Sequence, residues 1–436
     1  MFRLPSLLLV AAASLGAQNL VLNHVRLIDG TGAAPVEDAA IVIEGGVIRY
    51  AGPAAEAKAP ENAQTVDLEG KTVVPGIINL HGHVGNVKGL EQNNEFYTRE
   101  NVIDNLKTYA KYGVTTTTSM GTDEDLIVEI RDERRRDAIE GARVFTALQG
   151  FTTMGGYPTQ APGVKGVAQE TATAAQGRAR VDQLAEKGAD LVKMWVDGHH
   201  GQFQKLPPEM YEAIIDQAHK RDLLAFAHVY ELEDAKGLVR AGIDILGHSV
   251  RDSEADQELI DLLKKNNVTY VPTLTREKST YVYSEPPEWL DDPFFTQSVE
   301  DETIEAVKTD LKAAQSDAKV IEQGKQDFEM ASKNLAKLHE AGVMIAFGTD
   351  TGPPGRFPGY FEHWEAELMV DAGLEPMEVI ETWSAGSAKA LEIAKEFGTL
   401  EKGKVADLIV LDANPLDDIR NTRKIHAVYM GGKRVE

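Results

Sequence analysis

The strongest constraint on the fold is a regular alternation of apolar segments with amphipathic ones along the middle of the chain. Charged amphipathic stretches at 123–140, 207–222 and 256–267 predict helices between the apolar segments. The predicted strands cover 77–83, 113–121, 142–150, 190–198, 223–230, 243–249, 268–275 and 343–350. Strands that alternate with helices are typical of a parallel sheet, so the sequence predicts an α/β fold, specifically a (β/α)8 TIM-like barrel.

Residues that can bind a metal stand near the ends of several of these strands. They are His81, His83, Lys193, His228, His248 and Asp350. In a barrel of this kind the carboxyl ends of the strands form the active-site face, so these side chains are expected to converge there. Their number and order along the chain indicate a site for two metal ions.

Two details of this set carry chemical information. Alternate residues of a strand point to the same face, so His81 and His83 form a chelating pair with Gly82 opposite. Lys193 lies among Val192, Met194 and Trp195, where a long cation must lose its solvation, reach outward or lose its charge. A neutral amine at this position can take up carbon dioxide and become a carbamate.

Several motifs together resemble the amidohydrolase superfamily, in the branch of imidazolonepropionase-like proteins and metal-dependent dipeptidases of the prolidase type. The matching pieces are PGIINLHGH, YGVTTTTSMG, the Lys193 strand, AHVY, AGIDILGHS, FGTDTG and GTLEKGKVADLIVLDANPLDDI. They cover nearly all of the chain after residue 17. One departure is Asn79, where many relatives carry an acidic residue two positions before the first ligand.

The resemblance implies a mechanism. His81, His83 and Asp350 would hold the more buried metal, His228 and His248 the more exposed one, and carboxylated Lys193 with a hydroxide would bridge them. Asp350 would take a proton from the hydroxide and pass it to the leaving nitrogen, so that a C–N amide bond of a small substrate is cleaved. Dipeptides, N-acyl amino acids and cyclic amides are the expected substrates, rather than extended peptides. Without any cysteine, the ligands are nitrogen and oxygen, which suits zinc, manganese or iron, with zinc preferred.

Other polar residues are candidates for contacts with the substrate. Tyr230 matches a substrate-facing tyrosine of related dipeptidases and is a candidate catalytic residue, while Tyr157 stands where many relatives have a histidine. An arginine can bind a substrate carboxylate through two hydrogen bonds, although a surface salt bridge is the alternative use of each one. The further candidates are His199, His200, Arg276, Arg356 and His363.

Three other functions stay open at this point. His228 and Glu231 form a His-x-x-Glu sequence, which in single-metal deaminases of the superfamily supplies a ligand and a general acid. A lactone or phosphoester substrate would react at the same site. A degenerate barrel that only binds a partner is the non-enzymatic alternative, and the retained ligands argue against it.

Both ends of the chain predict β-structure. Short strands with glycine turns occupy residues 18–74, and 396–436 has the same character, so the two ends are expected to form one β-sandwich beside a catalytic barrel of residues 75–395. The segment 276–326 interrupts the β/α rhythm with proline, tyrosine, tryptophan and many charges. It is predicted to be either an active-site lid or a surface helix pair.

Charge and the first residues limit partners and location. The chain has 45 Lys and Arg against 69 Asp and Glu, a net charge of −24 that disfavours binding to nucleic acid or to an anionic membrane. Residues 1–17 resemble a secretory signal peptide, with cleavage near Ala17 and a mature chain from Gln18. An uncleaved anchor is the alternative. The protein is therefore expected to be periplasmic or secreted, with a small-molecule substrate and an oligomeric state left open.

Overall fold

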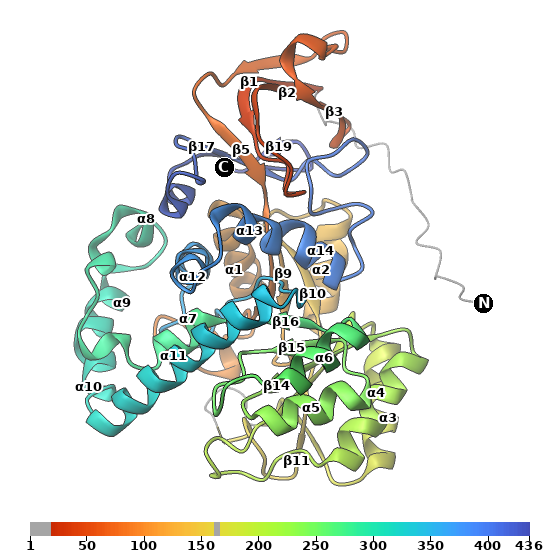
Figure 1. Ribbon diagram of the computed structural model, residues 1–436, viewed down its shortest axis with the longest axis vertical. Coiled ribbons are helices and arrows are strands. Elements are labelled where there is room, and N and C mark those ends of the chain that lie inside the picture. The colour runs from red at the N-terminus through yellow and green to blue at the C-terminus, as the bar shows by residue number, and fades with distance from the viewer. Residues whose placement is uncertain (1–18, 161–165) are drawn as a thin grey trace.

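The computed structural model describes residues 19–160 and 166–436. The predicted signal peptide lies outside these residues. The described chain is a mixed α/β structure in which one sheet, built from both chain ends, lies at one end of the molecule, and a central set of parallel strands surrounded by helices makes up the rest (Figure 1).

The terminal sheet joins segments more than 300 residues apart in the sequence. Its strands are hydrogen-bonded in the order β19-β18-β17-β5-β1-β2-β3, with β4 also paired to β1. The join is the antiparallel pairing of β17 with β5, in which Leu408 lies opposite Pro75. These strands are β1 Leu20–Leu27, β2 Val36–Glu44, β3 Val47–Pro53, β4 Gln64–Asp67, β5 Thr72–Pro75, β17 Leu408–Leu411, β18 Ile425–Met430 and β19 Lys433–Arg434.

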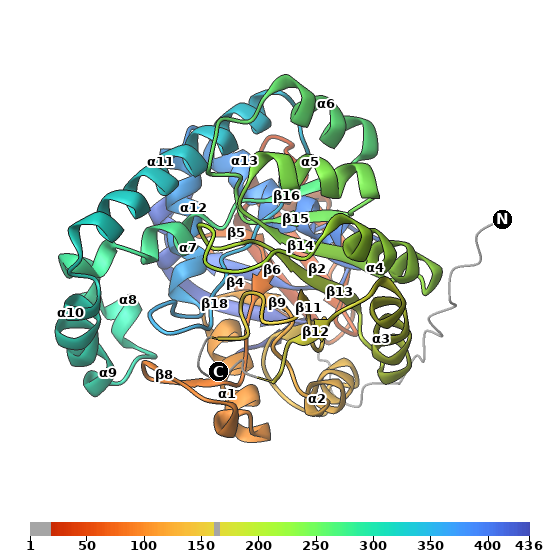
Figure 2. The ribbon, with the colours of Figure 1, turned by 90° about the horizontal axis from the view of Figure 1, so that it is seen from below.

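The central strands run parallel in two hydrogen-bonded groups, β10-β9-β6 and β12-β11-β13-β14-β15-β16. Helices lie outside them when the molecule is seen from below (Figure 2). The strands are β6 Ile77–Gly82, β9 Val114–Ser119, β10 Arg143–Thr146, β11 Phe151–Thr153, β12 Gln169–Thr171, β13 Leu191–Val196, β14 Leu224–Val229, β15 Ile245–Gly247 and β16 Thr269–Val271. A small hairpin, β7 Val87–Lys88 and β8 Glu91–Gln92, stands apart.

The predicted strand at 343–350 is extended but makes only isolated bridges, Tyr270 with Ile345 and Gly82 with Thr351. Its backbone still connects β16 with β6. The Tyr270 N–H donates to the Met344 carbonyl oxygen at 2.9 Å, and the Leu80 N–H donates to the Phe347 carbonyl oxygen at 2.8 Å. On the other side, the Asp190 N–H donates to the Thr146 carbonyl oxygen at 2.9 Å and links β13 to β10. The two groups of strands are therefore joined at both edges.

The strands bury both faces, as the apolar runs predict. On β13, Val192 and Met194 pack in the large core against the helices, whereas Leu191 belongs to a separate core with Ile245 and Phe226. Lys193 shares the strand face of Leu191, as His228 shares that of Phe226. The alternation therefore directs the proposed ligands into the space that the strands enclose.

The helices begin and end where the sequence provides caps. The Thr98 hydroxyl accepts from the Asn101 N–H at the start of α1, and α5 ends at Gly242 in the left-handed conformation. The helices that follow the strands are α1 Arg99–Lys111, α2 Leu126–Arg135, α3 Ala174–Lys187, α4 Pro208–Lys220, α5 Leu232–Ala241, α6 Gln257–Asn266, α12 Tyr360–Asp371, α13 Pro376–Glu381 and α14 Ser387–Ala390.

The segment 276–326 forms a helical insert, whose shorter helices stand at the side of the molecule (Figure 1). The long helix that follows, α11, packs against α7 and returns the chain to the central strands. The helices of this region are α7 Leu274–Ser279, α8 Pro293–Thr296, α9 Asp301–Ala306, α10 Lys312–Ala314 and α11 Ala318–Glu340. Shorter turns are η3 Val282–Ser284, η4 Glu288–Asp291 and the π-helical turn η5 Val307–Leu311.

Candidate metal centre

Three of the other five predicted ligands gather around the Asp350 carboxylate. Its Oδ1 atom lies 3.0 Å from His83 Nε2 and 3.4 Å from His81 Nε2. Its Oδ2 atom lies 4.0 Å from His248 Nε2. Ligand atoms of His81, His248 and Asp350 all lie within 4.8 Å of one another, and the three residues are buried. This group could hold a divalent metal ion.

Lys193 reaches the same group from β13. Its Nζ atom lies 3.4 Å from His81 Nε2 and 4.5 Å from the centre of the Phe226 ring, and the residue is fully buried. Within residues 19–160 and 166–436 it forms no ion pair. Burial lowers the pKa of Lys193 to about 7, although the charge of Asp350 acts in the opposite direction. Much of the amine is therefore uncharged near neutral pH.

His228 completes the cluster from β14. Its ring lies 4.2 Å from the His248 ring, centre to centre. Its Nε2 atom lies 2.7 Å from an Asp197 carboxylate oxygen, so that nitrogen carries the proton and donates it. Nδ1 is left as the nitrogen that can bind a metal. The structure thus brings together all six residues that the strand ends predict as ligands.

Three partners that hold the imidazoles were not found from the sequence. Besides Asp197 on His228, the Thr122 hydroxyl lies 2.9 Å from His83 Nδ1, and the Thr273 hydroxyl lies 2.7 Å from His248 Nδ1. Such contacts fix the orientation of a ligand ring and leave the other nitrogen for the metal. Each partner stands within a few residues of the carboxyl end of an observed strand, β9, β13 or β16, and this position is the one signal that could have identified it.

Three of the buried imidazoles are held in the neutral form. Burial lowers the pKa of His81 and His248 well below the usual range, and it lowers the pKa of His228 to about 3. A neutral imidazole keeps a nitrogen lone pair for a metal. His81 Nδ1 is also buried with no hydrogen-bond partner in the described chain. Burying these uncharged polar rings costs free energy, and apolar packing alone does not offset that cost.

The backbone turns sharply at two of the proposed ligands. His248 has φ +70° and Asp350 has φ +58°, a left-handed conformation that is uncommon outside glycine. Such residues concentrate at functional sites, where the surrounding structure holds them. Gly352 completes the Asp350 turn because a Cβ atom there would lie 2.3 Å from the His83 carbonyl oxygen. The turn therefore needs a glycine two residues after Asp350.

Asp350 itself is held as a carboxylate. The Arg356 guanidinium donates to Asp350 Oδ2 and to the Asp350 carbonyl oxygen at 3.2 Å. Burial opposes ionisation, but Arg356, with His81 and His83, places the pKa of Asp350 well below its usual range. Arg356 is thus engaged with the proposed ligand.

Asn79, the position that departs from the family pattern, connects the first ligand strand to a buried acid. Its Oδ1 atom accepts the His81 N–H at 3.0 Å, and its Nδ2 atom donates to Glu362 Oε1 at 2.7 Å. The Thr349 and Thr351 hydroxyls, on either side of Asp350, donate to the same oxygen at 2.8 and 2.9 Å. Glu362, which the sequence analysis did not identify, therefore ties both ligand segments together.

An aromatic wall stands beside His228. The Tyr157 ring stacks on His199 with centres 5.1 Å apart, and it lies 5.5 Å from the His228 ring. Phe203 lies against both Tyr157 and His199. The structure therefore places Tyr157 and His199 where a substrate bound near His228 would touch them.

Tyr230 and His200 lie beside α11, the helix that follows the insert. The Tyr230 hydroxyl donates to Asp327 Oδ1 at 3.0 Å, and His200 lies 4.8 Å from the Tyr230 ring. Burial and the Asp327 carboxylate raise the pKa of Tyr230. Because Asp327 belongs to α11, the helix that follows the insert forms part of this wall.

Arg276 lies at the start of the insert, on α7. It donates to the carboxylate of Glu277 at 2.7 Å, and Glu277 also lies 3.1 Å from Arg251 Nε. Burial acts to lower the pKa of Arg276, but Glu277 and the nearby Asp350 raise it, so the guanidinium stays charged.

His363 does not join the site, and the expectation that it contacts the substrate is wrong. Its Nδ1 atom lies 3.0 Å from the Thr422 hydroxyl, and its Nε2 atom lies 2.8 Å from the Tyr112 carbonyl oxygen. Both ring nitrogens are used, and the residue is buried on α12. The position of His363 after the Asp350 turn suggested proximity, but a helix directs neighbouring residues to different faces.

Glu231, the acid of the deaminase alternative, faces Lys205. Its carboxylate lies 2.8 Å from Lys205 Nζ, and the side chain is 42% exposed. It stands at the N-terminal cap of α5 and makes no hydrogen bond or ion pair to a proposed ligand.

Comparison with known proteins identifies the protein family. The Amidohydrolase family model matches residues 72–435. Imidazolonepropionase of Streptomyces griseus is 25% identical, covering 96% of this chain and 97% of its own length. A stretch of Aspergillus niger ochratoxinase is 26% identical over 57% of this chain and 46% of the fungal protein. The solved structure of a putative prolidase from Bifidobacterium longum has a TM-score of 0.77 and 27% identity over 96% of this chain and 94% of its own.

The chain therefore belongs to the amidohydrolase family, as the sequence motifs predict. It is an enzyme that hydrolyses carbon–nitrogen bonds. The family is metal-dependent, in agreement with the buried group of His81, His248 and Asp350. No helix of the described residues has the length and apolar character needed to cross a bilayer.

Proposed function

We propose that this amidohydrolase is a two-metal enzyme that cleaves the amide bond of a small substrate. The eight segments predicted from the sequence, seven of them parallel strands and the last at 343–350, are joined at both edges. This arrangement supports a (β/α)8 barrel of residues 75–395. The terminal sheet supports a separate β-sandwich unit of residues 18–74 and 396–436. The active site would then lie at the carboxyl ends of the strands, where the proposed metal ligands lie.

The donor set fits two divalent cations. Three imidazoles have one nitrogen fixed by Thr122, Thr273 or Asp197, and the fourth has a buried nitrogen without a partner. Imidazole nitrogen with carboxylate oxygen suits zinc. His81, His83 and Asp350 would hold one ion and His228 and His248 the other. When bound, the ions would lower the pKa of a water and polarise the substrate carbonyl.

One observation carries this proposal: Lys193 is fully buried, with its amine 3.4 Å from His81 and without an ion pair in the described chain. A protonated amine at this distance from the imidazoles would repel a metal ion. Reaction of the neutral amine with carbon dioxide would convert it into a carbamate, whose two oxygens could each face one ion. N6-carboxylated Lys193 is therefore the proposed bridging ligand.

Asp350 is the residue that moves the proton. Its carboxylate is ionised and contacts both His81 and His83. Asp350 would accept a proton from the attacking water as the oxygen bonds to the amide carbon. It would then give that proton to the leaving nitrogen as the C–N bond breaks. The products are a carboxylate and an amine.

The substrate class follows from the walls of the site and from the relatives. Tyr157, His199 and Tyr230 would enclose a small molecule rather than a long peptide, and Arg276 is a charged donor for a substrate carboxylate. The similarity to an imidazolonepropionase and to a putative prolidase supports a cyclic amide, a dipeptide or an N-acyl amino acid. Tyr230 would orient this substrate through its hydroxyl.

A screen tests the proposal. Metal-loaded enzyme is incubated with dipeptides, N-acyl amino acids, lactones and aminated heterocycles, and the bound metal is counted by elemental analysis. We expect two ions per chain and release of an amine together with a carboxylate. One ion and released ammonia would support deamination instead, and hydrolysis confined to lactones would overturn the amide assignment.

We also propose that the protein is exported after removal of residues 1–17. The support is the order of features in that segment, which has a positive charge first, then a short apolar run, and then small residues. N-terminal sequencing of the protein from fractionated cells tests it: a cytoplasmic protein that still starts at Met1 would contradict export.

A further inference from the structure

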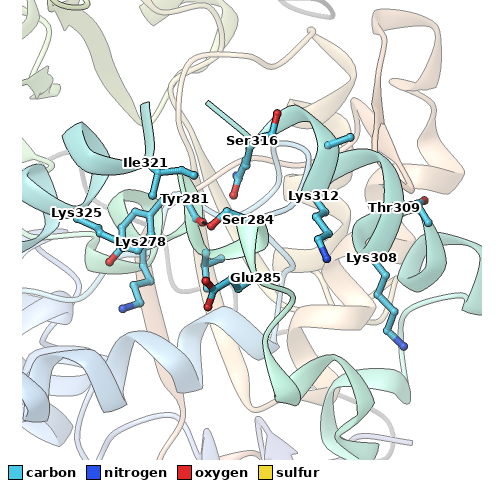
Figure 3. A pocket seen from close by; sticks show the side chains of 13 residues that line it. Lys278, Tyr281, Ser284, Glu285, Lys308, Thr309, Lys312, Ser316, Ile321 and Lys325 are labelled. Atoms are coloured by element: carbon cyan, nitrogen blue, oxygen red, sulfur yellow. Dashed lines mark hydrogen bonds between the residues drawn. The ribbon is translucent and has the colours of Figure 1, made fainter. Parts of the chain in front are cut away.

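A second cavity lies in the helical insert, and none of the proposed metal ligands lines it. This insert cavity has a volume of about 770 Å³ and lies between α7, η3, η5, α10 and the start of α11 (Figure 3). Its charged and polar lining includes Lys278, Ser284, Glu285, Lys308, Lys312 and Lys325. The volume is in the range of cavities that hold a small organic ligand.

The charge of this lining is opposite to that of the chain. The protein has a net charge of −24, yet four lysines and a single carboxylate face the insert cavity. Lys308 is paired with Asp291 at 2.9 Å and with Glu305 at 3.6 Å. Lys278, Lys312 and Lys325 form no ion pair within the described part of the chain. Three amines without an ion pair around one cavity could together attract an anion.

Two of these amines also interact unfavourably with each other. Burial lowers the pKa of Lys278, Asp371 acts to raise it, and the charge of Lys325 makes a smaller contribution that lowers it. Lys278 Nζ lies 4.6 Å from the centre of the Phe328 ring and 5.3 Å from that of Tyr281, which holds the amine beside the cavity. An anion near both lysines would remove this repulsion.

The walls of the cavity are fixed by hydrogen bonds. Gln315 accepts the Tyr283 N–H at 2.9 Å and donates to the Ser279 carbonyl oxygen at 2.7 Å, so it joins α10 to η3 and α7. Lys308 and Thr309 project from the π-helical turn η5. Single π-helical turns are rare and are often found at functional sites. The cavity is therefore held open by specific local structure.

We propose that the insert cavity binds a small organic dianion between Lys278, Lys312 and Lys325. Tyr281 and Ile321 supply apolar surface for a carbon skeleton. A dicarboxylate and a phosphate ester share the required chemistry. A nucleic acid is a poor fit because the strongly acidic chain repels a long polyanion.

Calorimetric titration of the metal-loaded enzyme tests this proposal. The first probe is propane-1,3-disulfonate, a dianion that binds metals weakly, at constant ionic strength. The double variant Lys312→Gln with Lys325→Gln is compared with Lys319→Gln with Lys402→Gln, two exposed lysines outside the cavity. Both double variants change the net charge equally. We expect saturable binding that weakens at least about tenfold in the cavity variant and is unchanged in the control.

Two further experiments identify the class of ligand and distinguish binding in the insert cavity from binding at the proposed metal centre. Glutarate and glycerol 2-phosphate are titrated in the same way, and the tighter of the two shows whether a dicarboxylate or a phosphate ester is preferred. Lys193→Ala, which should disturb the metals, is expected to keep the binding. Absence of saturable binding for all three probes, equal weakening in the control variant, or loss of binding in Lys193→Ala would each overturn the proposal.

Discussion

At the scale of single residues, Lys193 is the residue on which the proposed two-metal centre depends. We predict that Lys193→Ala loses this centre and at least about a hundredfold in kcat, because an alanine cannot form the proposed bridging carbamate. Elemental analysis and steady-state kinetics measure both effects. Added formate should restore part of the activity because it supplies a carboxylate to the vacated position. Wild-type activity with two metals bound would exclude a bridging role.

Glu362 is the second residue with a specific prediction. Burial raises the pKa of Glu362 to about 7, above that of a glutamate in an unfolded chain. The folded protein then keeps a proton that the unfolded chain releases, so this residue makes stability fall as the pH rises from about 4.5 to 7, by on the order of 3 kcal/mol at most.

Glu362→Gln removes this titration, so its stability relative to the wild type should increase over the same pH interval. Denaturant unfolding of both metal-free proteins from pH 5 to 8 gives the difference, in which the opposing contribution of the buried histidines cancels. The variant should also lose the hydrogen bond from the Gly359 N–H, which the wild-type carboxylate accepts at 2.7 Å. A stability difference that does not change with pH would show that Glu362 is ionised in the folded protein.

At the scale of elements, the insert is connected to the loop of Asp350. The Tyr283 hydroxyl, on η3, donates to the Gly355 carbonyl oxygen, and the next residue, Arg356, holds the Asp350 carboxylate. Asp327, on α11 just after the insert, accepts the hydrogen bond of Tyr230. The lid and the surface helix pair without substrate contact both stay predictions.

Tyr283→Phe tests this connection. Loss of one buried hydrogen bond should cost about 1 kcal/mol of stability and, because the Arg356 loop loosens, lower kcat/KM by about threefold to tenfold. Tyr281→Phe is the matched control, since its hydroxyl makes no hydrogen bond in the described chain. Equal kinetics of the two variants would show that Tyr283 does not position the loop.

At the scale of the whole molecule, the proposed metal centre should also stabilise the fold, because the proposed ligands lie in or just after β6, β13, β14 and β15 and in the Asp350 turn. Ions that bind only the folded state stabilise it by about 4 kcal/mol when they are present at a thousand times their dissociation constant. We predict that removing the metals with a chelator, followed by dialysis, lowers the melting temperature by several degrees and that zinc restores it. Differential scanning calorimetry measures this shift, and an identical melting curve without metal would contradict it.

The sequence by itself determined seven of the eight predicted strand positions, the residues that gather at the candidate site, and the family. These features are local, because an apolar run that contains a histidine or a lysine predicts a strand with a polar side chain wherever that strand lies in the fold. The eighth predicted segment, 343–350, is not a regular strand, because it makes only isolated bridges and a few backbone hydrogen bonds to β16 and β6.

Only the tertiary structure decided which distant residues meet. Asp197 on His228, Glu362 on Asn79 and Tyr283 on Gly355 are contacts between different elements, and no period or spacing in the sequence encodes them. The same holds for His363, which follows the Asp350 turn in sequence but faces Thr422 and Tyr112. The direction in which a helical side chain points depends on how that helix packs. Residues that are close in the sequence can therefore face different parts of the structure.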